Sequence, residues 1–136
     1  MIDPDSLARL ALFADLSRAE LEAAGQLFDE QMYETGERIL RQGLTGNAFY
    51  VLLDGCVAIK IDGTERARLF PGDFFGEVSI LTGEPPTADV VAMNAIRCAV
   101  LGEPDVEGFL IRNPRVMLRM LQAEARRVRS ANLWHG

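Results

Sequence analysis

The sequence predicts a mainly β domain, an antiparallel sandwich or barrel, with helices on either side of it. From Met32 to Leu101, short runs rich in Val, Ile and Phe alternate with eight glycines. Two Asp-Gly pairs, Asp54-Gly55 and Asp62-Gly63, are typical of tight hairpin turns. Motifs that begin helices lie on both sides of this region, which places the helices at the two ends of the chain.

Two helices are expected at the N-terminus. Asp3-Pro4 combines an N-cap residue with a proline at the first helical position, which predicts a short helix through Leu12. Ser17 and Glu20 have the spacing of a capping box, and apolar residues follow at helical spacing. The second helix should therefore extend from about 18 to 30.

The central region contains six segments with the composition of strands, at residues 38–41, 48–53, 57–61, 66–70, 90–93 and 97–101. One apolar segment, Phe75–Leu81, breaks the pattern because it lies between two turns rich in Gly and Pro. It fits either a strand or one short helical turn.

Two more helices should complete the chain, from Pro104 to Ile111 and onward from Asn113-Pro114, where asparagine is the N-cap. The longer one is strongly amphipathic at 100° per residue. Its apolar face comprises Met117, Leu118, Met120, Leu121, Ala125, Val128 and Ala131, and its basic face comprises Arg112, Arg115, Arg119, Arg126 and Arg129. Glu124 falls within the apolar face, either as a snorkelling carboxylate or as the partner of an arginine across a helix–helix interface.

Composition excludes several classes of protein. The 136 residues are 49% apolar and 25% charged, as in one globular domain. Two cysteines, Cys56 and Cys98, are too few for a disulfide framework or a four-cysteine metal site, and we expect buried, reduced thiols. The single histidine, His135, argues against histidine-rich metal sites and Ser-His-Asp catalysis, so we expect no metal, no cofactor and no enzyme.

The chain is also expected to be cytoplasmic and to bind neither membrane nor nucleic acid. No segment approaches the roughly 18 apolar residues of a membrane span, and the acidic N-terminus is unlike a secretory signal. The net charge is −6, although residues 112–136 carry six basic groups and one acidic group. We interpret this basic stripe as a solvated face that balances the acidic remainder, because no aromatic residues are interleaved with it.

One long motif is highly specific. The segment from Pro71 to Ala92 reads PGDFFGEVSILTGEPPTADVVA, and it closely resembles the phosphate-binding cassette of cyclic nucleotide-binding domains. The glycines in residues 34–37, 41–43 and 49–55 agree with the same family, so the resemblance covers nearly the whole chain. It implies a double-stranded β-helix, a jelly-roll-like β-roll, with two N-terminal helices, a short cassette helix and a long C-terminal helix. The three parts would be residues 1–31, 32–103, with the cassette at 72–90, and 104–134.

The resemblance implies a ligand site for cyclic AMP or cyclic GMP. The implied binding residues are Gly76, Glu77, Val78, Ser79, Pro86, Thr87 and Ala88. In such a site, a glycine lets the backbone approach the ligand, a carboxylate accepts the ribose 2′-hydroxyl, and a hydroxyl and an amide contact the phosphate. Each has a structural alternative: Gly76 as a roll turn, Glu77 as a carboxylate at a helix N-terminus and Thr87 as an ordinary strand residue.

The sequence departs from the family at one position. The family has an arginine immediately before the Ser/Thr of the cassette, where it pairs with the phosphate, and this chain has Pro86 there. Loss of a charge-assisted hydrogen bond weakens binding by roughly ten- to hundredfold. Arg66, Arg68 and Arg97 lie on neighbouring predicted strands, either as substitutes for this charge or as solvated residues.

Three functions compete on these grounds. The first is a stand-alone sensor module that binds a cyclic nucleotide weakly, and the second is a degenerate module that serves as a protein-interaction or dimerisation scaffold. An enzyme on a barrel fold is the third, and it lacks an identifiable nucleophile or metal set.

Relatives pair through the long helix, so we expect a homodimer with Met117, Leu121, Glu124 and Val128 near its axis; the alternative is that the helix folds back onto the roll. The chain is either a detached module or a fragment of a longer protein, with an unknown effector.

Overall fold

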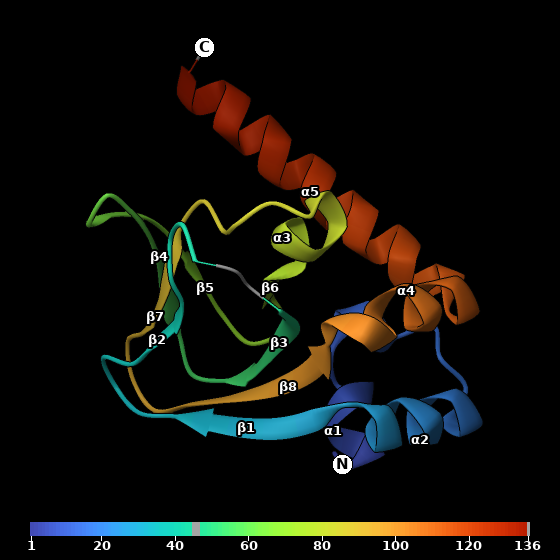
Figure 1. Ribbon diagram of the computed structural model, residues 1–136. Helices are drawn as coiled ribbons and strands as arrows, with labels where there is room; N and C mark the ends of the chain where they lie inside the picture. Colours follow the sequence, from blue (N-terminus) through green and yellow to red (C-terminus); the bar gives the residue numbers. More distant parts are fainter. Residues whose placement is uncertain (45–46, 136) are drawn as a thin grey trace.

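Two four-stranded antiparallel sheets form a roll that helices flank (Figure 1). The computed structural model describes residues 1–44 and 47–135, the last four of them by backbone only, so the expectations for Gly46 and the His135 side chain lie outside it. One sheet has the order β1-β8-β3-β6 and the other β2-β7-β4-β5. The strands are β1 (Asp29–Tyr33), β2 (Arg38–Leu40), β3 (Ala48–Asp54), β4 (Val57–Ile61), β5 (Thr64–Leu69), β6 (Phe74–Phe75), β7 (Asp89–Ala92) and β8 (Ile96–Gly102). The predicted mainly β domain with flanking helices is confirmed.

The helices are α1 (Pro4–Ala8), the short 3₁₀ helix η1 (Ala11–Phe13), α2 (Arg18–Leu27), α3 (Glu77–Thr82), α4 (Glu103–Arg112) and α5 (Pro114–His135). The capping box of Ser17 and Glu20 begins α2 as predicted. The expected ends of the first two helices are wrong, because the backbone is extended at Leu10 and at Phe28. Phe28 is fully buried, so core packing ends the second helix early. The ambiguous segment at Phe75–Leu81 divides into the end of β6 and most of α3.

Only one of the two Asp-Gly pairs forms a hairpin. Asp62 and Gly63, both with positive φ, connect the paired strands β4 and β5. Gly55 instead leads from β3 in one sheet to β4 in the other, so the hairpin expected there is wrong. A Cβ on Gly55 would lie 2.5 Å from the Ile96 side chain, which makes this turn a packing requirement between the sheets.

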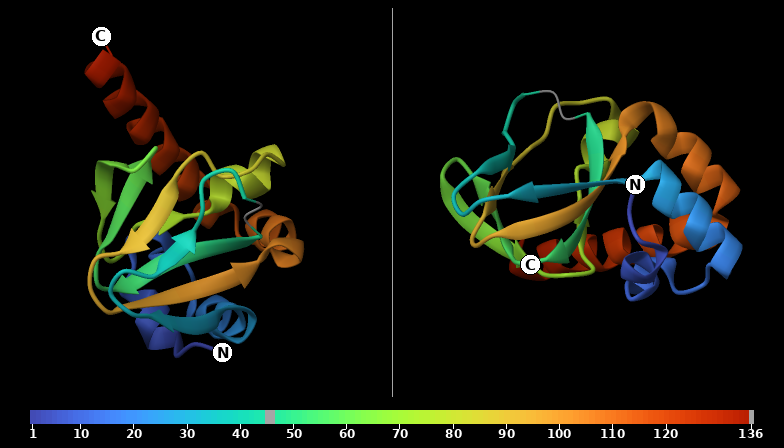
Figure 2. Two further views of the ribbon diagram at one scale, coloured as in Figure 1. Left: turned by 60° about the vertical axis from the view of Figure 1, so that its left-hand side comes forward. Right: turned by 90° about the horizontal axis from the view of Figure 1, so that it is seen from below.

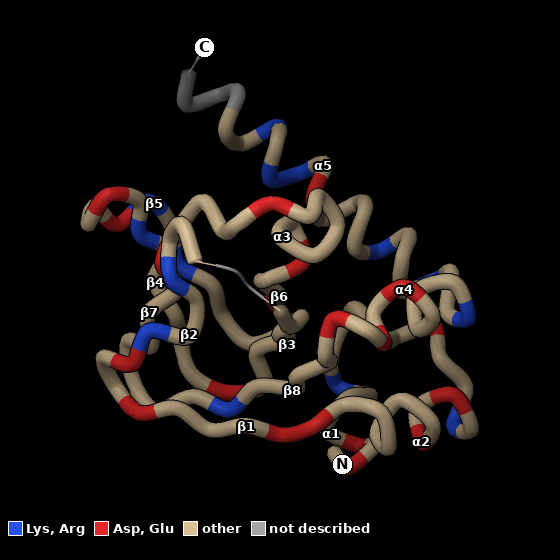
Figure 3. Tube along the Cα trace, in the orientation of Figure 1, with Lys and Arg blue, Asp and Glu red and all other residues tan. Residues whose placement is uncertain are grey.

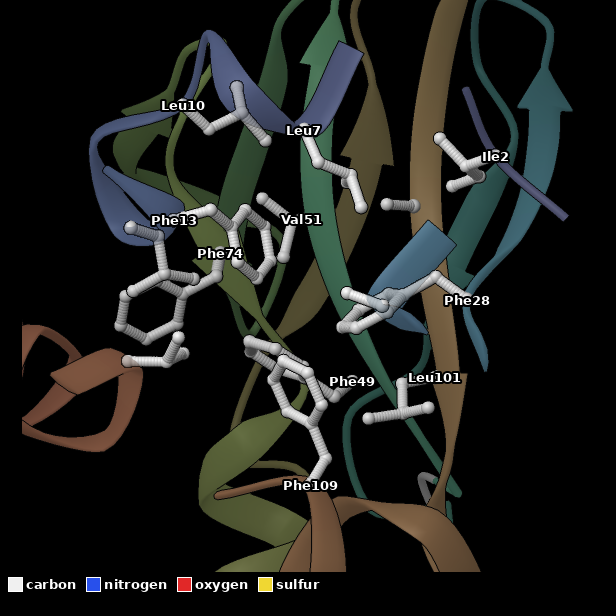
Figure 4. Close-up of a cluster of buried hydrophobic side chains, with 14 of the residues drawn as sticks. Ile2, Leu7, Leu10, Phe13, Phe28, Phe49, Val51, Phe74, Leu101 and Phe109 are labelled. Carbon is white, nitrogen blue, oxygen red and sulfur yellow. The ribbon is translucent and has the colours of Figure 1, made fainter. Parts of the chain in front are cut away.

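The roll separates two hydrophobic cores. One lies between the two sheets and includes Tyr50 and Phe75, whose rings stack with centroids 4.9 Å apart. The other lies between the sheet of β3 and the helices, where Phe13, Phe28 and Phe109 meet edge to face (Figure 4). Both cysteines are free thiols; Cys98 is buried as expected, whereas Cys56 is only partly so.

The long helix α5 passes along the roll beside α3 and continues beyond it towards the C-terminus (Figures 1 and 2). Arg115, Arg119 and Arg127 form ion pairs between this helix and the rest of the domain. Arg119 binds Asp15 with Nε–Oδ2 at 2.6 Å, and Arg127 reaches α3. Figure 3 shows that basic residues recur along this helix. Within the described residues, no helix is long and apolar enough to cross a membrane.

Candidate ligand pocket

A cavity of about 1250 Å³ lies between α5 and the roll. Its walls come from η1, β2, β4, β5, α5 and the segment that runs from β6 through α3 to β7. All seven ligand residues implied by the resemblance line it: Gly76, Glu77, Val78, Ser79, Pro86, Thr87 and Ala88. The fold therefore gathers the whole implied site around one space that is large enough for a nucleotide.

Gly76 shapes the entrance to α3. Its φ is 89°, and a Cβ there would lie 2.4 Å from the carbonyl oxygen of Ala48 and 3.1 Å from the Tyr50 ring. This left-handed backbone in contact with β3 requires glycine. Contact within the protein is thus enough to explain Gly76.

The next residues of α3 differ in their roles. The Ser79 hydroxyl donates to the carbonyl oxygen of Glu84 at 2.6 Å, so it closes the loop after α3. Val78 is about half exposed and contributes an apolar surface to the cavity wall. The Ser79 side chain is therefore occupied by a hydrogen bond within the protein, whereas the Val78 side chain supplies only apolar surface.

Glu77, the first residue of α3, is the most unusual group in the cavity. Its side chain is only 2% exposed, although carboxylates are rarely buried unless they are paired. One oxygen, Oε1, accepts a hydrogen bond from Arg127 at 3.0 Å. The other oxygen, Oε2, is buried and has no hydrogen-bond partner among the residues that the structure describes. A buried acceptor left unpaired costs roughly 1–3 kcal/mol.

Arg127 reaches this carboxylate from α5, 50 residues further along the chain. The same guanidinium nitrogen also donates to Glu124 at 2.9 Å, and the second nitrogen donates to the Phe74 carbonyl at 2.7 Å. The guanidinium carbon lies 4.4 Å from the centre of the Phe74 ring, within cation–π range. Arg127 therefore joins α5, β6 and α3 at one point.

Burial, together with the sharing of one guanidinium by two carboxylates, raises the pKa of Glu77 to about 7. Burial of the carboxyl group is the largest cause, and the negative charge of Glu124 adds to it. The positive charge of Arg127 acts in the opposite direction and is the weaker influence. At neutral pH, Glu77 therefore exists in both protonation states.

The other end of the cavity carries Pro86, Thr87 and Ala88. The backbone oxygen of Pro86 accepts a hydrogen bond from the Gly43 amide at 2.9 Å, which ties this segment to the connection after β2. Pro86 itself has neither a side-chain donor nor an N–H group. The Thr87 side chain is exposed. This wall therefore offers a hydroxyl and backbone groups, without a cation of its own.

The structure distinguishes the three arginines considered as substitutes. Arg97 pairs with Glu30 and Asp54 away from the cavity, and Arg68 pairs with Glu65 at 3.0 Å. Only Arg66 lines the cavity. The register of β4 and β5 shifts between Ile59 and Lys60, which leaves Arg66 opposite no residue, and such bulges redirect side chains. Within residues 1–44 and 47–131, Arg66 forms no ion pair.

The four residues expected near a dimer axis lie on one face of α5, but they differ in exposure and in pairing. Met117, Leu121 and Val128 are 43%, 64% and 59% exposed. Glu124 instead turns towards the roll and pairs with Arg127 of its own helix, so the arginine that binds it is within the chain. The apolar side chains remain available to a second copy, and dimerisation stays a prediction.

Sequence reasoning missed Arg127. This residue falls between the apolar and basic faces of α5, so neither stripe includes it. The available signal was local: Glu124 and Arg127 are three residues apart, a spacing that pairs side chains on a helix. Its more important partner, Glu77, is distant in sequence and could be paired with it only once the fold was known.

Known proteins resemble both the sequence and the fold. The family model of the cyclic nucleotide-binding domain matches residues 30–113. A protein of Rhodopseudomonas palustris that is named for a potassium channel is 32% identical over 131 residues. That match covers 93% of this chain and 32% of the relative, so the chain spans about a third of that protein.

Two solved structures extend the comparison. The catabolite activator protein of Thermus thermophilus is 33% identical, with a TM-score of 0.79, and the match covers 90% of this chain and 60% of that one. The regulatory subunit of a cAMP-independent protein kinase A from Trypanosoma cruzi, bound to guanosine, is 25% identical with a TM-score of 0.73. This second match covers 85% of this chain and 42% of the other.

Proposed function

The chain belongs to the cyclic nucleotide-binding domain family, and from this premise we propose that it is a regulatory sensor domain that binds cyclic AMP or cyclic GMP weakly. The ligand occupies the cavity between α5 and the roll. Its ribose lies at Glu77, and its cyclic phosphate lies at Thr87 and Ala88. The observation that carries the proposal is the unpaired, buried Oε2 atom of Glu77 at the wall of this cavity.

The ribose end favours a ligand with a hydroxyl donor. Because Oε1 of Glu77 already accepts from Arg127, Oε2 is the atom left for a ligand. A hydrogen bond from a ribose 2′-hydroxyl would remove the cost of this unpaired acceptor. The acceptor is a carboxylate, so such a bond is charge-assisted and stronger than one between neutral groups.

The phosphate end explains why we expect the binding to be weak. A cyclic phosphate carries one negative charge, and Pro86 stands where the family has its arginine. The missing charge-assisted hydrogen bond is worth on the order of 1.5–3 kcal/mol, or roughly ten- to hundredfold in affinity. We therefore expect dissociation constants no tighter than tens of micromolar, as an order of magnitude.

The same observation favours a second candidate, an uncharged ribonucleoside. Such a ligand keeps the ribose hydroxyl for Glu77 and places no negative charge against Pro86. The relative from Trypanosoma cruzi that was solved with guanosine makes this ligand class relevant here. Adenosine and guanosine are therefore natural comparisons in a binding experiment.

The exposed apolar side chains of α5 suggest how such a module assembles. Met117, Leu121 and Val128 lie on its accessible surface, so a second copy can bury them in a two-fold interface. Leu121→Glu should shift the protein from dimer to monomer in sedimentation, whereas Arg129→Glu, an exposed charge reversal nearby, should leave the dimer intact. A wild type that sediments as a monomer at high micromolar concentration would contradict dimerisation.

Isothermal titration calorimetry tests the proposed function directly. Wild-type protein is titrated with cyclic AMP, cyclic GMP, adenosine and guanosine in one buffer. Weak but saturable heat with a cyclic nucleotide supports the proposal, and sub-micromolar affinity contradicts its weak-binding part. Heat from nucleosides alone selects the second candidate. If no ligand gives heat at millimolar concentration, the domain is a scaffold for protein contacts.

A further inference from the structure

We infer that Glu124 is a positioning residue of the ligand site: by sharing Arg127 with the buried Glu77, it helps Glu77 to hold a proton, which leaves when a ligand hydroxyl donates a charge-assisted hydrogen bond to the carboxylate. This inference rests on the proposed function and adds regulation to the same site. It makes ligand binding release a proton, so the affinity rises with pH. The argument begins from the contacts of one guanidinium group.

Arg127 cannot neutralise both carboxylates. One of its nitrogens donates to Glu77 at 3.0 Å and to Glu124 at 2.9 Å. With both carboxylates ionised, the three groups carry a net charge of minus one where Glu77 is only 2% exposed. Binding one proton removes this excess, and the most buried carboxylate is the one whose charge is costliest.

Among the described residues, the other charged groups of the cavity wall do not shift the pKa of Glu77. Its own helix and β6 contribute Phe74, Phe75, Val78 and Ser79, and η1 contributes Ala11 and Leu12, none of which titrates near neutral pH. Other charged groups of the cavity wall are Glu65, Arg66, Asp73, Arg119 and Arg126. Arg119 is held by Asp15, and only Glu124 and Arg127 are charged groups that shift the pKa of Glu77.

The position of the proton links it to the ligand. Because Oε1 accepts from Arg127, Oε2 is the oxygen left to carry the proton, and it is also the atom that a ribose hydroxyl would approach. A protonated Oε2 is a donor and no longer a charged acceptor. With a pKa of about 7, roughly half a proton should leave per ligand at pH 7, nearly one at pH 6 and nearly none at pH 8.

Two measurements test the inference. In ligand-free protein, carbon-13 NMR of the glutamate carboxyls, with Glu77 assigned through Glu77→Gln, should show Glu77 titrating near pH 7. Glu124→Gln should lower the pH at which Glu77 titrates, because it removes a neighbouring negative charge and frees Arg127 for Glu77, while the burial of Glu77 remains. Glu124→Asp should preserve the high titration, and Glu107→Gln, an exposed change on α4, should have no effect. If Glu77 of the wild type titrates below pH 5, the inference is wrong.

Calorimetry with cyclic AMP, or with adenosine if only nucleosides bind, measures the coupling. Titrations at pH 7 in buffers of different ionisation enthalpy should show about half a proton released by wild type and clearly less by Glu124→Gln. Equal release from both proteins would overturn the role of Glu124. If no ligand binds wild type or Pro86→Arg, the proposed function and the coupling both fail, while the NMR titration still decides proton binding by Glu77.

Discussion

The two ends of the cavity differ in how far the protein itself completes them. At the ribose end, Gly76 is fixed by contact with Ala48, and Glu77 is buried against a guanidinium group from a distant helix. At the other end, Pro86 and Thr87 are more accessible, and no cation pairs with them in the described structure. One end is built from long-range contacts, and the other depends on a few neighbouring residues.

This difference separates what maintains a pocket from what determines its ligand. The contacts of Gly76 and Glu77 also hold α3, β3 and α5 together, so they are needed for the fold whether or not a ligand binds. The hydrogen bond that ties position 86 to Gly43 involves the backbone oxygen and not the side chain. The side chain at this position is therefore free to change the charge of the pocket while the shape remains.

The largest effect should come from adding a cation to the phosphate end. Pro86→Arg should strengthen the binding of cyclic AMP or cyclic GMP by roughly ten- to hundredfold, because it supplies a charge-assisted hydrogen bond. Calorimetry in the same buffer measures the change. Pro86→Ala is the matched control, which removes the ring without adding charge, and it should alter the affinity little. No gain with arginine would mean that the pocket itself is closed to the phosphate.

The ion pair that joins α5 to Glu77 at the ribose end can be removed by a substitution in α5. Arg127→Gln removes the cation that faces Glu77 and the hydrogen bond to the Phe74 carbonyl. We expect a loss of about 1–2 kcal/mol in the free energy of unfolding, measured in urea. Arg126→Gln, on the adjacent exposed residue, should cost almost nothing. Equal stability of the two variants would show that Arg127 does not hold α5 to the roll.

Substitution of Glu77 should reduce the affinity most clearly in a variant that already binds the phosphate. In the Pro86→Arg background, Glu77→Gln keeps the shape of the side chain but removes its charge. The affinity for cyclic AMP should fall by roughly tenfold, because a charged acceptor is replaced by a neutral one. The affinity for a 2′-deoxy analogue, which has no hydroxyl to donate, should be unchanged by this substitution.

Much of the fold is predictable from the sequence because its determinants are local. The capping box of Ser17 and the turn at Asp62-Gly63 occur where their residue types require them. The strand β1 was missed because its five residues, Asp29–Tyr33, are mostly polar and exposed at the edge of the sheet. Phe28 ends α2 through burial in a core that no local pattern reveals.

The candidate site also has one part that the sequence identifies and another that only the fold reveals. The cassette from Gly76 to Ala88 is contiguous, so its resemblance to the family identified the wall of the cavity before the structure. Arg127 is not in that segment, and the raised pKa of Glu77 depends on three groups that meet only after α5 packs beside α3. Sequence pattern therefore identifies the residues of the site better than their charge state.

The smallest expected effect concerns Arg66, the one cavity-lining arginine among the three substitutes. Arg66→Gln in the wild type should weaken the binding of cyclic AMP by about two- to threefold, because an exposed charge acts through solvent. Its effect should shrink at high salt, whereas Arg68→Gln, where Glu65 already neutralises the charge, should change nothing. A tenfold loss would mean that Arg66 contacts the phosphate and compensates for Pro86.

The central claim is that the ribose end already has the carboxylate acceptor that the ligand needs, whereas the phosphate end lacks one positive charge. The most direct test compares cyclic AMP with adenosine, by calorimetry, in wild type and in Pro86→Arg. The account predicts that the wild type binds the two ligands with similar affinity and that arginine favours cyclic AMP by roughly tenfold or more. If the wild type already prefers cyclic AMP over adenosine by that factor and Pro86→Arg adds nothing, the pocket has its charge elsewhere and the account is contradicted.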